Sequence, residues 1–388
     1  MLQADITPNS LNFLIKLGQS LLFLPIGFRN GRFSKFMWLS KRAMAANFLT
    51  AISSLQFILY CNYFFKLENQ LPASSELIFY FSALVYKILL INVAKSYAIL
   101  MEKWQQIDTL MENYTETNNF RLKIKLVSLL LFLLALGDHI FFIASLGIFF
   151  NSMSIKDEIE EYFATIFEYF FIVVPYNGVL AIFLQLLNWL WTILWNYVDV
   201  FLMALCLCFT FRLGQIEQRV NILIENKVEE VYYWKQIRKH YVQLTELCLE
   251  LENCIAQLIL ASFFGKFYMA LYRLLGLLDG EKYGIQSDST KLFNKLYYGF
   301  SLLFVLLRMM TVTICASTID LKNKDIMFKL FAVSSDIYNI EIERFIMHIH
   351  VFPPTITAKL FEMKRSLVFK IASSIIIYEL VIIKFYKY

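Results

Sequence analysis

The chain ends on the stretch IIIYELVIIKFYKY (375–388), an apolar run that carries one glutamate and two lysines. A helix through this stretch places Glu379 near its middle and Lys384 near its last turn. A plain membrane anchor seldom holds a carboxylate at mid-depth, because a charge inside the hydrocarbon layer is costly. What this C-terminal helix does therefore depends on the character of the rest of the chain.

The composition is that of a helical membrane protein. Of the 388 residues, 59% are hydrophobic and 17% are charged, whereas soluble domains carry roughly 45–50% apolar and about 25% charged residues. Gly (12) and Pro (6) are scarce, which predicts long helices and few structured loops. The net charge of +5 requires no nucleic-acid partner, because membrane sidedness accounts for it.

Seven stretches are long and apolar enough to cross a bilayer, which takes about 20 residues. They are 43–66, 76–100, 126–150, 184–211, 256–278, 295–319 and 366–386. The apolar run 167–211 is too long for one crossing, and Pro175 and Asn177 divide it. We therefore expect 160–183 to form an outer-loop helix that lies against the membrane face. The sequence predicts an all-α membrane protein with seven transmembrane helices.

The distribution of Lys and Arg predicts the orientation of these spans. With the N-terminus inside, the cytosolic segments 1–42, 101–125, 212–255 and 320–365 hold 23 basic residues, and the outer loops, flanking span ends and tail hold six. The C-terminus then lies outside. We expect a cytosolic N-terminal segment (1–42), a six-span region (43–319) with cytosolic helical extensions (212–255), a cytosolic anchor segment (320–365) and a last helix (366–388).

Motifs of catalysis and metal binding are missing from the sequence. No zinc-protease, phosphate-loop, nucleophile-elbow or Cys-x-x-Cys motif occurs, which argues against an enzyme. His348 and His350 point about 200° apart on a helix, so a metal site is not favoured. The six cysteines fall in spans or predicted cytosolic segments and imply no disulfide framework. We expect no catalytic residue, no metal and no cofactor.

Several ionisable residues fall at membrane depth, where each needs a partner or a polar cavity. They are Lys87, Asp138, His139, Asp199, Lys266, Arg273, Arg308, Glu379 and Lys384. One interpretation is that Lys87, Arg308 and Glu379 form structural ion pairs, with Glu379 next to Arg308 or Lys87. The other is that some of these charges line a cavity for a small ligand. Asp138 and His139 are adjacent, so only one of them is expected to point directly at a given cavity.

Aromatic residues cluster in the outer halves of the spans. In NWLWTILWNYVD (188–199), Asn188, Trp191 and Trp195 share one helix face. Such residues commonly form an interfacial belt. The alternative is a pocket, because aromatic faces beside polar groups suit the apolar faces and polar edges of a sugar ring. The candidate ligand-binding residues are Asp138, His139, Asn188, Trp191, Trp195, Tyr268, Tyr272 and Tyr298.

The C-terminal stretch resembles the signature of insect gustatory receptors, which is Thr-Tyr, five mostly apolar positions and Gln-Phe. The matching run here is IYELVIIKF (377–385), and its YEL (378–380) resembles the sugar-receptor branch. The resemblance covers nearly the whole length, in the family's order and spacing. It continues in WNYVDVF (195–201), FRLGQIEQRV (211–220), WKQIRKHYVQL (234–244), SFFGKFY (262–268) and YYGFSLLFVLLR (297–308).

The resemblance implies the insect chemoreceptor channel fold, with a cytosolic N-terminus and an extracellular C-terminus. It implies a ligand-gated cation channel for taste detection in the plasma membrane, with a sugar as the favoured tastant. The channel would be a homo- or heterotetramer with related receptors, in contact with membrane lipid. Helix 366–388 would line the pore through Ile377, Val381 and Lys384, and the first six spans would enclose a ligand pocket open to the outside.

The sequence departs from the family pattern at three places. Ile377 replaces the family's Thr, Lys384 replaces its Gln, and Gly265-Lys266 stands where sugar receptors tend to have polar amides. Four lysines around a pore mouth would oppose cation flow. Lys384 therefore turns outward, or is held uncharged, or the subunit conducts poorly and works in a heteromer.

Other functions stay open at this point. A bitter-tuned receptor or a non-conducting partner subunit of the same family is the first alternative. A seven-span G-protein-coupled receptor is the rival from another class, and its outside N-terminus conflicts with the charge bias. A transporter would predict repeated halves, and the sequence contains no internal repeat.

Overall fold

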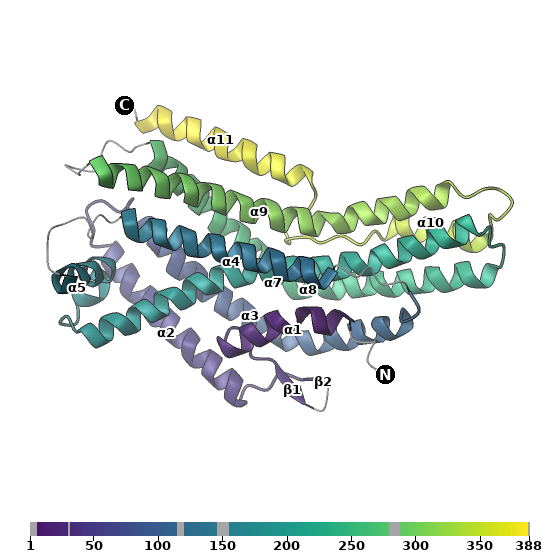
Figure 1. Ribbon diagram of the computed structural model, residues 1–388, viewed down its shortest axis with the longest axis horizontal. Coiled ribbons are helices and arrows are strands. Elements are labelled where there is room, and N and C mark those ends of the chain that lie inside the picture. The colour runs from purple at the N-terminus through teal and green to yellow at the C-terminus, as the bar shows by residue number, and fades with distance from the viewer. Residues whose placement is uncertain (1–5, 30–31, 115–119, 146–154, 279–287, 387–388) are drawn as a thin grey trace.

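The computed structural model describes residues 6–29, 32–114, 120–145, 155–278 and 288–386, which form an elongated bundle of helices along one long axis (Figure 1). The elements in chain order are α1 (Ile6–Ser20), β1 (Gly27–Arg29), β2 (Arg32–Ser34), α2 (Lys41–Phe64), α3 (Ser74–Leu110), α4 (Phe120–Ser145), α5 (Ile155–Ile166), α6 (Glu168–Phe171), α7 (Gly178–Glu225), α8 (Val231–Leu278), α9 (Asp288–Phe331), α10 (Ile340–Val351) and α11 (Ser366–Tyr386).

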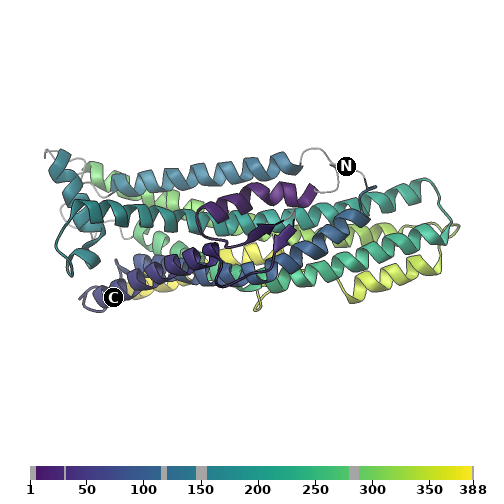
Figure 2. The same cartoon turned by 90° about the horizontal axis from the view of Figure 1, so that it is seen from below.

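Six helices of the described chain are long and apolar enough to cross a membrane: α2, α3, α4, α7, α8 and α9. A shorter apolar stretch, Ser366–Tyr378, lies in α11. Each predicted span overlaps one of these seven helices, so the helical membrane class is confirmed. The antiparallel hairpin β1–β2, which pairs Gly27 with Ser34, is an addition that the hydropathy pattern did not predict. Figure 2 shows α1 and this hairpin on the same side of the bundle.

The prediction of one outer-loop helix over 160–183 is wrong. α5 ends at Ile166, α6 is a four-residue helix, and α7 begins at Gly178. The Asn177 side chain accepts hydrogen bonds from the backbone N–H groups of Val179 (2.9 Å) and Leu180 (3.3 Å). Such a cap satisfies amides that the first helical turn leaves without partners. The fourth long helix therefore starts at residue 178 and not at 184.

α7 and α8 are far longer than a bilayer is thick. Each has 48 residues, or about 72 Å of helix, against roughly 30 Å of hydrocarbon. Residues 212–255 belong to the ends of these two helices, which meet in a turn between Glu225 and Val231. α9 continues beside them, and α10 packs against α8 and α9 at the same end of the molecule (Figure 1).

Burial separates the central helix from the peripheral ones. In the most apolar 18-residue window, 83% of α7 is buried within the subunit, against 11% of α4. The outward face of α4 is more than half exposed at Leu126, Leu129, Leu130, Leu133 and Leu136. A soluble monomer rarely shows so large an apolar patch, and lipid contact explains it. α7 is therefore the axis around which the other spans pack.

Several charged residues at the end of the bundle that holds α10 form ion pairs. Glu341 of α10 accepts hydrogen bonds from Arg238 and from Arg344, each at 2.8 Å. Burial alone would raise the pKa of Glu341, but hydrogen bonds from the two guanidinium groups outweigh burial and hold that pKa below its ordinary value. Nearby, Lys322 and Lys329 both bind Glu217. These pairs join α7, α8, α9 and α10.

Candidate ligand-binding site

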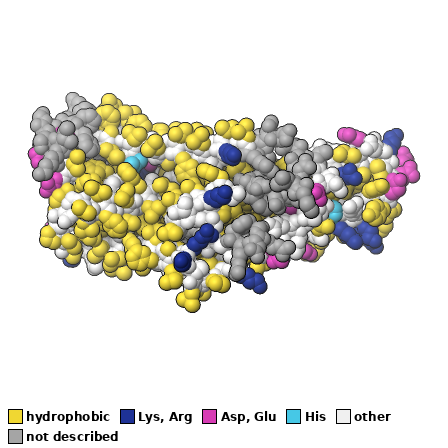
Figure 3. Space-filling model, turned by 60° about the horizontal axis from the view of Figure 1, so that its bottom comes forward, with side chains coloured by type: hydrophobic (Ala, Val, Ile, Leu, Met, Phe, Trp, Pro, Cys, Tyr) yellow, Lys and Arg dark blue, Asp and Glu magenta, His cyan; other side chains and the backbone are white. Residues whose placement is uncertain are grey.

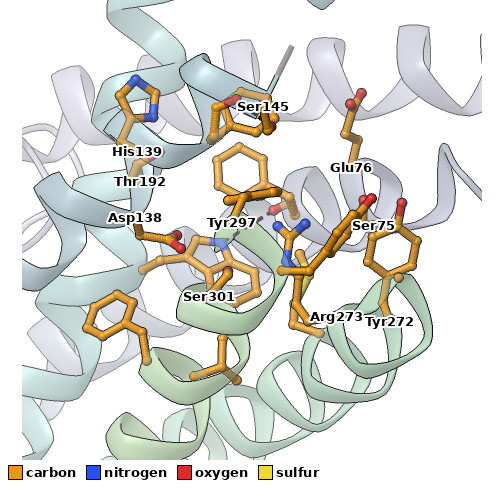
Figure 4. A pocket seen from close by; sticks show the side chains of 18 of the residues that line it. Ser75, Glu76, Asp138, His139, Ser145, Thr192, Tyr272, Arg273, Tyr297 and Ser301 are labelled. Carbon is orange, nitrogen blue, oxygen red and sulfur yellow. Dashed lines mark hydrogen bonds between the residues drawn. The ribbon is translucent and has the colours of Figure 1, made fainter. Parts of the chain in front are cut away.

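A cavity of about 420 Å³ lies among α3, α4, α7, α8 and α9, in the half of the molecule that also holds α5. Small-molecule sites typically measure about 300–1,000 Å³. Figure 4 shows polar side chains converging on it from several helices: Ser75 and Glu76 of α3, Asp138 and His139 of α4, Thr192 of α7, Arg273 of α8, and Tyr297 and Ser301 of α9. The cavity therefore combines aromatic surface with several charged and hydroxyl groups.

Six of the eight candidate ligand-binding residues line this cavity: Asp138, His139, Asn188, Trp195, Tyr272 and Tyr298. The other two lie elsewhere. Trp191 is fully buried and donates its indole N–H to Oε1 of Gln56 at 2.7 Å. Tyr268 is not part of the cavity wall. The pattern of aromatics thus pointed to residues that line one cavity, but it did not separate core side chains from lining ones.

Asp138 and His139 both reach the wall, although they are adjacent on α4. Nε2 of His139 accepts a hydrogen bond from the indole N–H of Trp189 at 2.9 Å. Oδ1 of Asp138 is buried and has no hydrogen-bond partner among the described residues. In Figure 4 the Asp138 carboxylate faces the side of the cavity where Arg273 lies. Of the two adjacent residues, Asp138 therefore has an oxygen that can still accept a hydrogen bond, whereas Nε2 of His139 already accepts one.

Arg273 is held by aromatic rings. Its Cζ atom lies 4.5 Å from the ring centroid of Tyr297, 5.6 Å from that of Tyr272 and 5.8 Å from that of Tyr298. Cation–π contacts of this kind attract the guanidinium without using its N–H groups. Its Nε atom is buried and lacks a partner in the described part of the chain. Since buried polar atoms are nearly always hydrogen-bonded, Asp138 and Arg273 are the candidate contacts for a polar ligand.

The inner side of the cavity ends on a buried charge cluster, which consists of Asp199, Lys266 and Arg308. Oδ1 of Asp199 accepts a hydrogen bond from Nζ of Lys266 at 2.6 Å, and Oδ2 accepts one from Nε of Arg308 at 2.7 Å. The three side chains are at most 6% exposed. Ser262 donates to Oδ1 at 2.8 Å, and Nη2 of Arg308 donates to the backbone oxygen of Trp195 at 2.7 Å. The charge cluster ties α7, α8 and α9 together.

The predicted pairing of Glu379 with Arg308 or Lys87 stays a prediction, and the described residues give both cations other partners. Arg308 pairs with Asp199, and Nζ of Lys87 donates to the backbone oxygen of Leu22 at 2.5 Å. The side chain of Glu379 lies outside the described residues. The pairing was missed because Asp199 and Arg308 are 109 positions apart in the chain, and local patterns do not report which helices touch.

The wall also contains residues that the sequence did not single out as ligand-binding: Glu76, Thr192, Arg273, Tyr297 and Ser301. A signal was available for some of them. Arg273 follows Tyr272 directly, and Ser301 lies one helical turn after Tyr297 on α9. The position of Glu76 depends on how α3 packs, which the sequence does not show.

The predicted pore residues lie on α11 at the edge of the bundle (Figure 1). Ile377 is 60% and Val381 45% exposed on this single subunit, and Lys384 is exposed too. α11 packs against α8 and α9. One contact joins it to the site-bearing helices directly, because the rings of Phe267 and Tyr378 are 6.0 Å apart. Pore lining by α11 stays a prediction.

The ranges that the structure describes offer no metal site. No group of three or more His, Cys, Asp and Glu side chains there could hold a metal ion. The six cysteines are all free.

These features describe a multi-pass helical membrane protein with a cavity between its spans. The insect olfactory receptor OR5 from Machilis hrabei, solved in complex with eugenol, is similar in fold, with a TM-score of 0.64 over 96% of this chain and 98% of that chain at 12% identity. A second structure of OR5 gives 0.63 at 13% identity. At such low identity the likeness concerns the fold alone, and it confirms the predicted insect chemoreceptor fold.

The family follows from the sequence. The family model described as trehalose receptor matches residues 25–388, and the chain belongs to that family. Two relatives from Drosophila melanogaster are similar. Gustatory receptor for sugar taste 64a is 26% identical over 95% of this chain and 82% of its own length. Gustatory receptor 5a for trehalose is 26% identical over 80% and 69%. These relatives are receptors, which confirms the predicted resemblance to sugar gustatory receptors and agrees with a chain that is not an enzyme.

Proposed function

We propose that this protein is a gustatory receptor of the plasma membrane that acts as a ligand-gated cation channel, and that its tastant is a sugar. Membership of the trehalose receptor family supports the ligand class, and the olfactory receptor fold supports the architecture. The observation that carries the proposal is the cavity in which Asp138 and Arg273 each keep a buried polar atom without a partner among the described residues, beside aromatic faces.

A sugar would use both kinds of surface in this cavity. Its C–H face would lie on the rings of Trp195 and Tyr298, whose flat surfaces suit such contact. One hydroxyl would donate to Oδ1 of Asp138, and another would accept from Nε of Arg273. Asn188 offers an amide to a further hydroxyl. Charge-assisted hydrogen bonds of this kind fix the orientation of a neutral ligand as well as its affinity.

Coupling between this cavity and a pore would run through α8 and α9. Both helices supply cavity residues, Arg273 from α8 and Tyr298 from α9, and both pack against α11. The ring contact of Phe267 with Tyr378 joins α8 directly to α11, so a movement of α8 would be transmitted to α11. In a tetramer with the N-terminus inside, ligand binding would move α11 outward and open a gate near Val381.

Heterologous expression tests the proposal. The chain is expressed in oocytes alone and with related sugar receptors, and whole-cell currents are recorded while a panel of mono- and disaccharides is applied. An inward cation current in response to a sugar is the expected result. Flat currents across the whole panel in every combination would overturn both the ligand and the channel. Epitope tags at each end test the orientation, and an outside N-terminus would favour a G-protein-coupled receptor.

A non-conducting partner subunit is the second candidate, and Lys384 favours it. Lys384 is exposed on α11 and shares a helix face with Ile377 and Val381. Four such lysines around a pore would repel cations. Lys384→Gln should increase the cation current if this face lines the pore, and should change little if the side chain turns to the membrane interface. A response to bitter compounds in place of sugars would identify the bitter-tuned alternative.

A further inference from the structure

The segment KFMWLSKR (35–42), which connects the β1–β2 hairpin to α2, combines exposed apolar and basic side chains. Met37, Trp38 and Leu39 are 64%, 55% and 87% exposed. Lys35 precedes this apolar tip and Lys41 follows it, and both are exposed. The three adjacent apolar side chains are poorly solvated by water, and the lysines on either side of them are poorly solvated by hydrocarbon. They suit the boundary between the two.

The segment is held in a defined place on the bundle. Nη1 of Arg42 donates to the backbone oxygen of Ile26 at 2.8 Å. The ring of Phe33 meets that of Tyr97 on α3 edge-on, with centroids 5.4 Å apart. Nζ of Lys95 on α3 lies over the ring of Trp38 in a cation–π contact, 4.6 Å from the ring centroid. Trp38 and Lys95 are therefore at the same level along the bundle.

The level of Trp38 and Lys95 lies about one bilayer thickness along the bundle from the start of α3. Lys95 lies 21 residues after Ser74, the start of α3, which is about 32 Å of helix. The hydrocarbon layer measures roughly 30 Å. α2 gives the same answer, because its 24 residues from Lys41 to Phe64 span about 36 Å. Lys41 and Lys95 thus stand where two spans leave the hydrocarbon, beside Trp38.

Charge selects the kind of lipid that this surface fits. From Ile6 to Leu67 the sequence contains no acidic residue, so no carboxylate of this stretch offsets its lysines and arginines. Figure 3 shows Lys and Arg side chains in a row across the middle of the molecule, where the predominantly apolar half ends. A zwitterionic headgroup gives such a surface little net attraction. An anionic one attracts each basic residue near the membrane.

We propose that Lys35, Lys41 and Lys95, with the tip Met37-Trp38-Leu39, form a binding site for anionic phospholipid headgroups at the end of α2. The lysines bind the phosphate and carboxylate oxygens, and the tip inserts among the first acyl carbons. The site holds the hairpin and the start of α2 at a fixed depth. It rests on neither the sugar ligand nor the channel activity, so either can fail without affecting it.

The first test measures lipid selectivity. Purified full-length protein in detergent micelles is titrated with phosphatidylserine or phosphatidylcholine, and the thermal unfolding midpoint is recorded. Phosphatidylserine should raise the midpoint of the wild type further than phosphatidylcholine does. Lys35→Gln/Lys41→Gln should abolish this excess and weaken the apparent affinity for phosphatidylserine, by roughly fivefold for each lysine. Equal shifts by the two lipids in the wild type would overturn the proposal.

A matched control removes the same charge elsewhere. Lys235 and Lys239 are exposed near the start of α8, at the end of the molecule remote from the apolar half. Lys235→Gln/Lys239→Gln should keep the full excess shift. An equal loss in both double variants would show that only net charge matters, and would also overturn the site.

The second test measures the depth of Trp38. The protein is reconstituted in phosphatidylserine vesicles that contain lipids brominated either near the headgroup or at the acyl chain end. The fluorescence of Trp38 is taken as the difference between the wild type and Trp38→Phe. Quenching by the shallow label and little by the deep one is expected. Absence of quenching by both would mean that another subunit or water covers the tip, and would refute the proposal.

Discussion

Arg308 and Arg273 line the same cavity, yet their surroundings differ in kind. Arg308 is buried and binds the carboxylate of Asp199 and a backbone oxygen. Arg273 is half-buried among three tyrosine rings, and its Nε has no partner among the described residues. One guanidinium is committed to joining helices, and the other is positioned but still has a donor to offer. Hydrogen-bond partners, more than depth of burial, therefore separate structural charges from candidate ligand-binding ones.

The largest effect is expected from removing the shared carboxylate of the charge cluster. Asp199→Ala leaves Lys266 and Arg308 buried without a counter-charge. Loss of one partner in a buried pair costs roughly 3–5 kcal/mol, so little folded protein should reach the membrane. Surface yield and the thermal midpoint in detergent are the measurements. The control is Asp320→Ala, which breaks a pair one helical turn apart with Lys324, whose side chain is 50% exposed, and should cost under about 1 kcal/mol. Normal yield of Asp199→Ala would refute the structural role.

Asp138→Asn should have the opposite profile, because it alters the cavity and spares the helix contacts. A hydrogen bond to a charged group contributes about 1.5–3 kcal/mol, so the half-maximal sugar concentration should rise roughly 10- to 100-fold. The thermal midpoint without ligand should stay within experimental error of the wild type. Dose–response currents and melting curves measure the two quantities on the same preparations. Unfolding of this variant with unchanged sugar potency in the surviving channels would break the comparison.

Gly265 offers a smaller, steric perturbation between the two regions. A Cβ atom there would lie 2.9 Å from Oγ of Ser82 and 3.3 Å from the Trp195 ring. Gly265→Ala should destabilise the protein by about 1–3 kcal/mol through overpacking and should lower sugar potency by displacing Trp195. Gly214→Ala is the matched control, since a Cβ at Gly214 meets nothing within 4 Å and helix propensity favours Ala. Equal midpoints for the two variants would contradict the close approach.

The smallest effect concerns Glu341, far from the cavity. Its pKa is lowered in the folded protein, so the stability that it contributes is complete above its unfolded pKa of about 4.3 and is lost as the pH falls through the lower folded value. Glu341→Gln should lower stability at pH 7 by about 1 kcal/mol, because the amide oxygen of Gln still accepts one of the two hydrogen bonds from the arginines. The gap between wild-type and variant melting midpoints should close on acidification. A gap that widened in acid would contradict the assignment.

The sequence predicted those features that depend on local pattern. Apolar runs located the spans, because burial in lipid selects for hydrophobic residues over a length set by the bilayer. The aromatic spacing around Trp195 marked a helix face from which Asn188 and Trp195 line the cavity. Features that depend on which helices touch were not predictable in this way, and the pairing of Asp199 with Arg308 is the clearest example. Trp191 was assigned to the pocket because one helix face can carry both core and lining residues.

Other features were missed because their local sequence signals were weak or pointed to different helix boundaries. Pro175 and the apolar run after it favoured a late start for the fourth long helix, but the Asn177 cap begins α7 at Gly178. The hairpin β1–β2 has only three residues in each strand, too few for a hydrophobic alternation to be visible. The depth of Trp38 depends on its contact with Lys95 of α3, a helix that the sequence around Trp38 does not identify as its neighbour.

The arithmetic of the charge cluster sets how this sequence is free to drift. Asp199 faces two cations, so a neutral residue at position 266 or at position 308 would leave a matched pair, whereas a neutral residue at 199 would leave both cations without a counter-charge. Inherited change to a neutral residue should therefore be tolerated at 266 or at 308, one at a time, and should be rare at 199 while both cations are present. Arg308 also donates to the backbone oxygen of Trp195, so the unusual Lys266 of this chain is the more replaceable of the two cations.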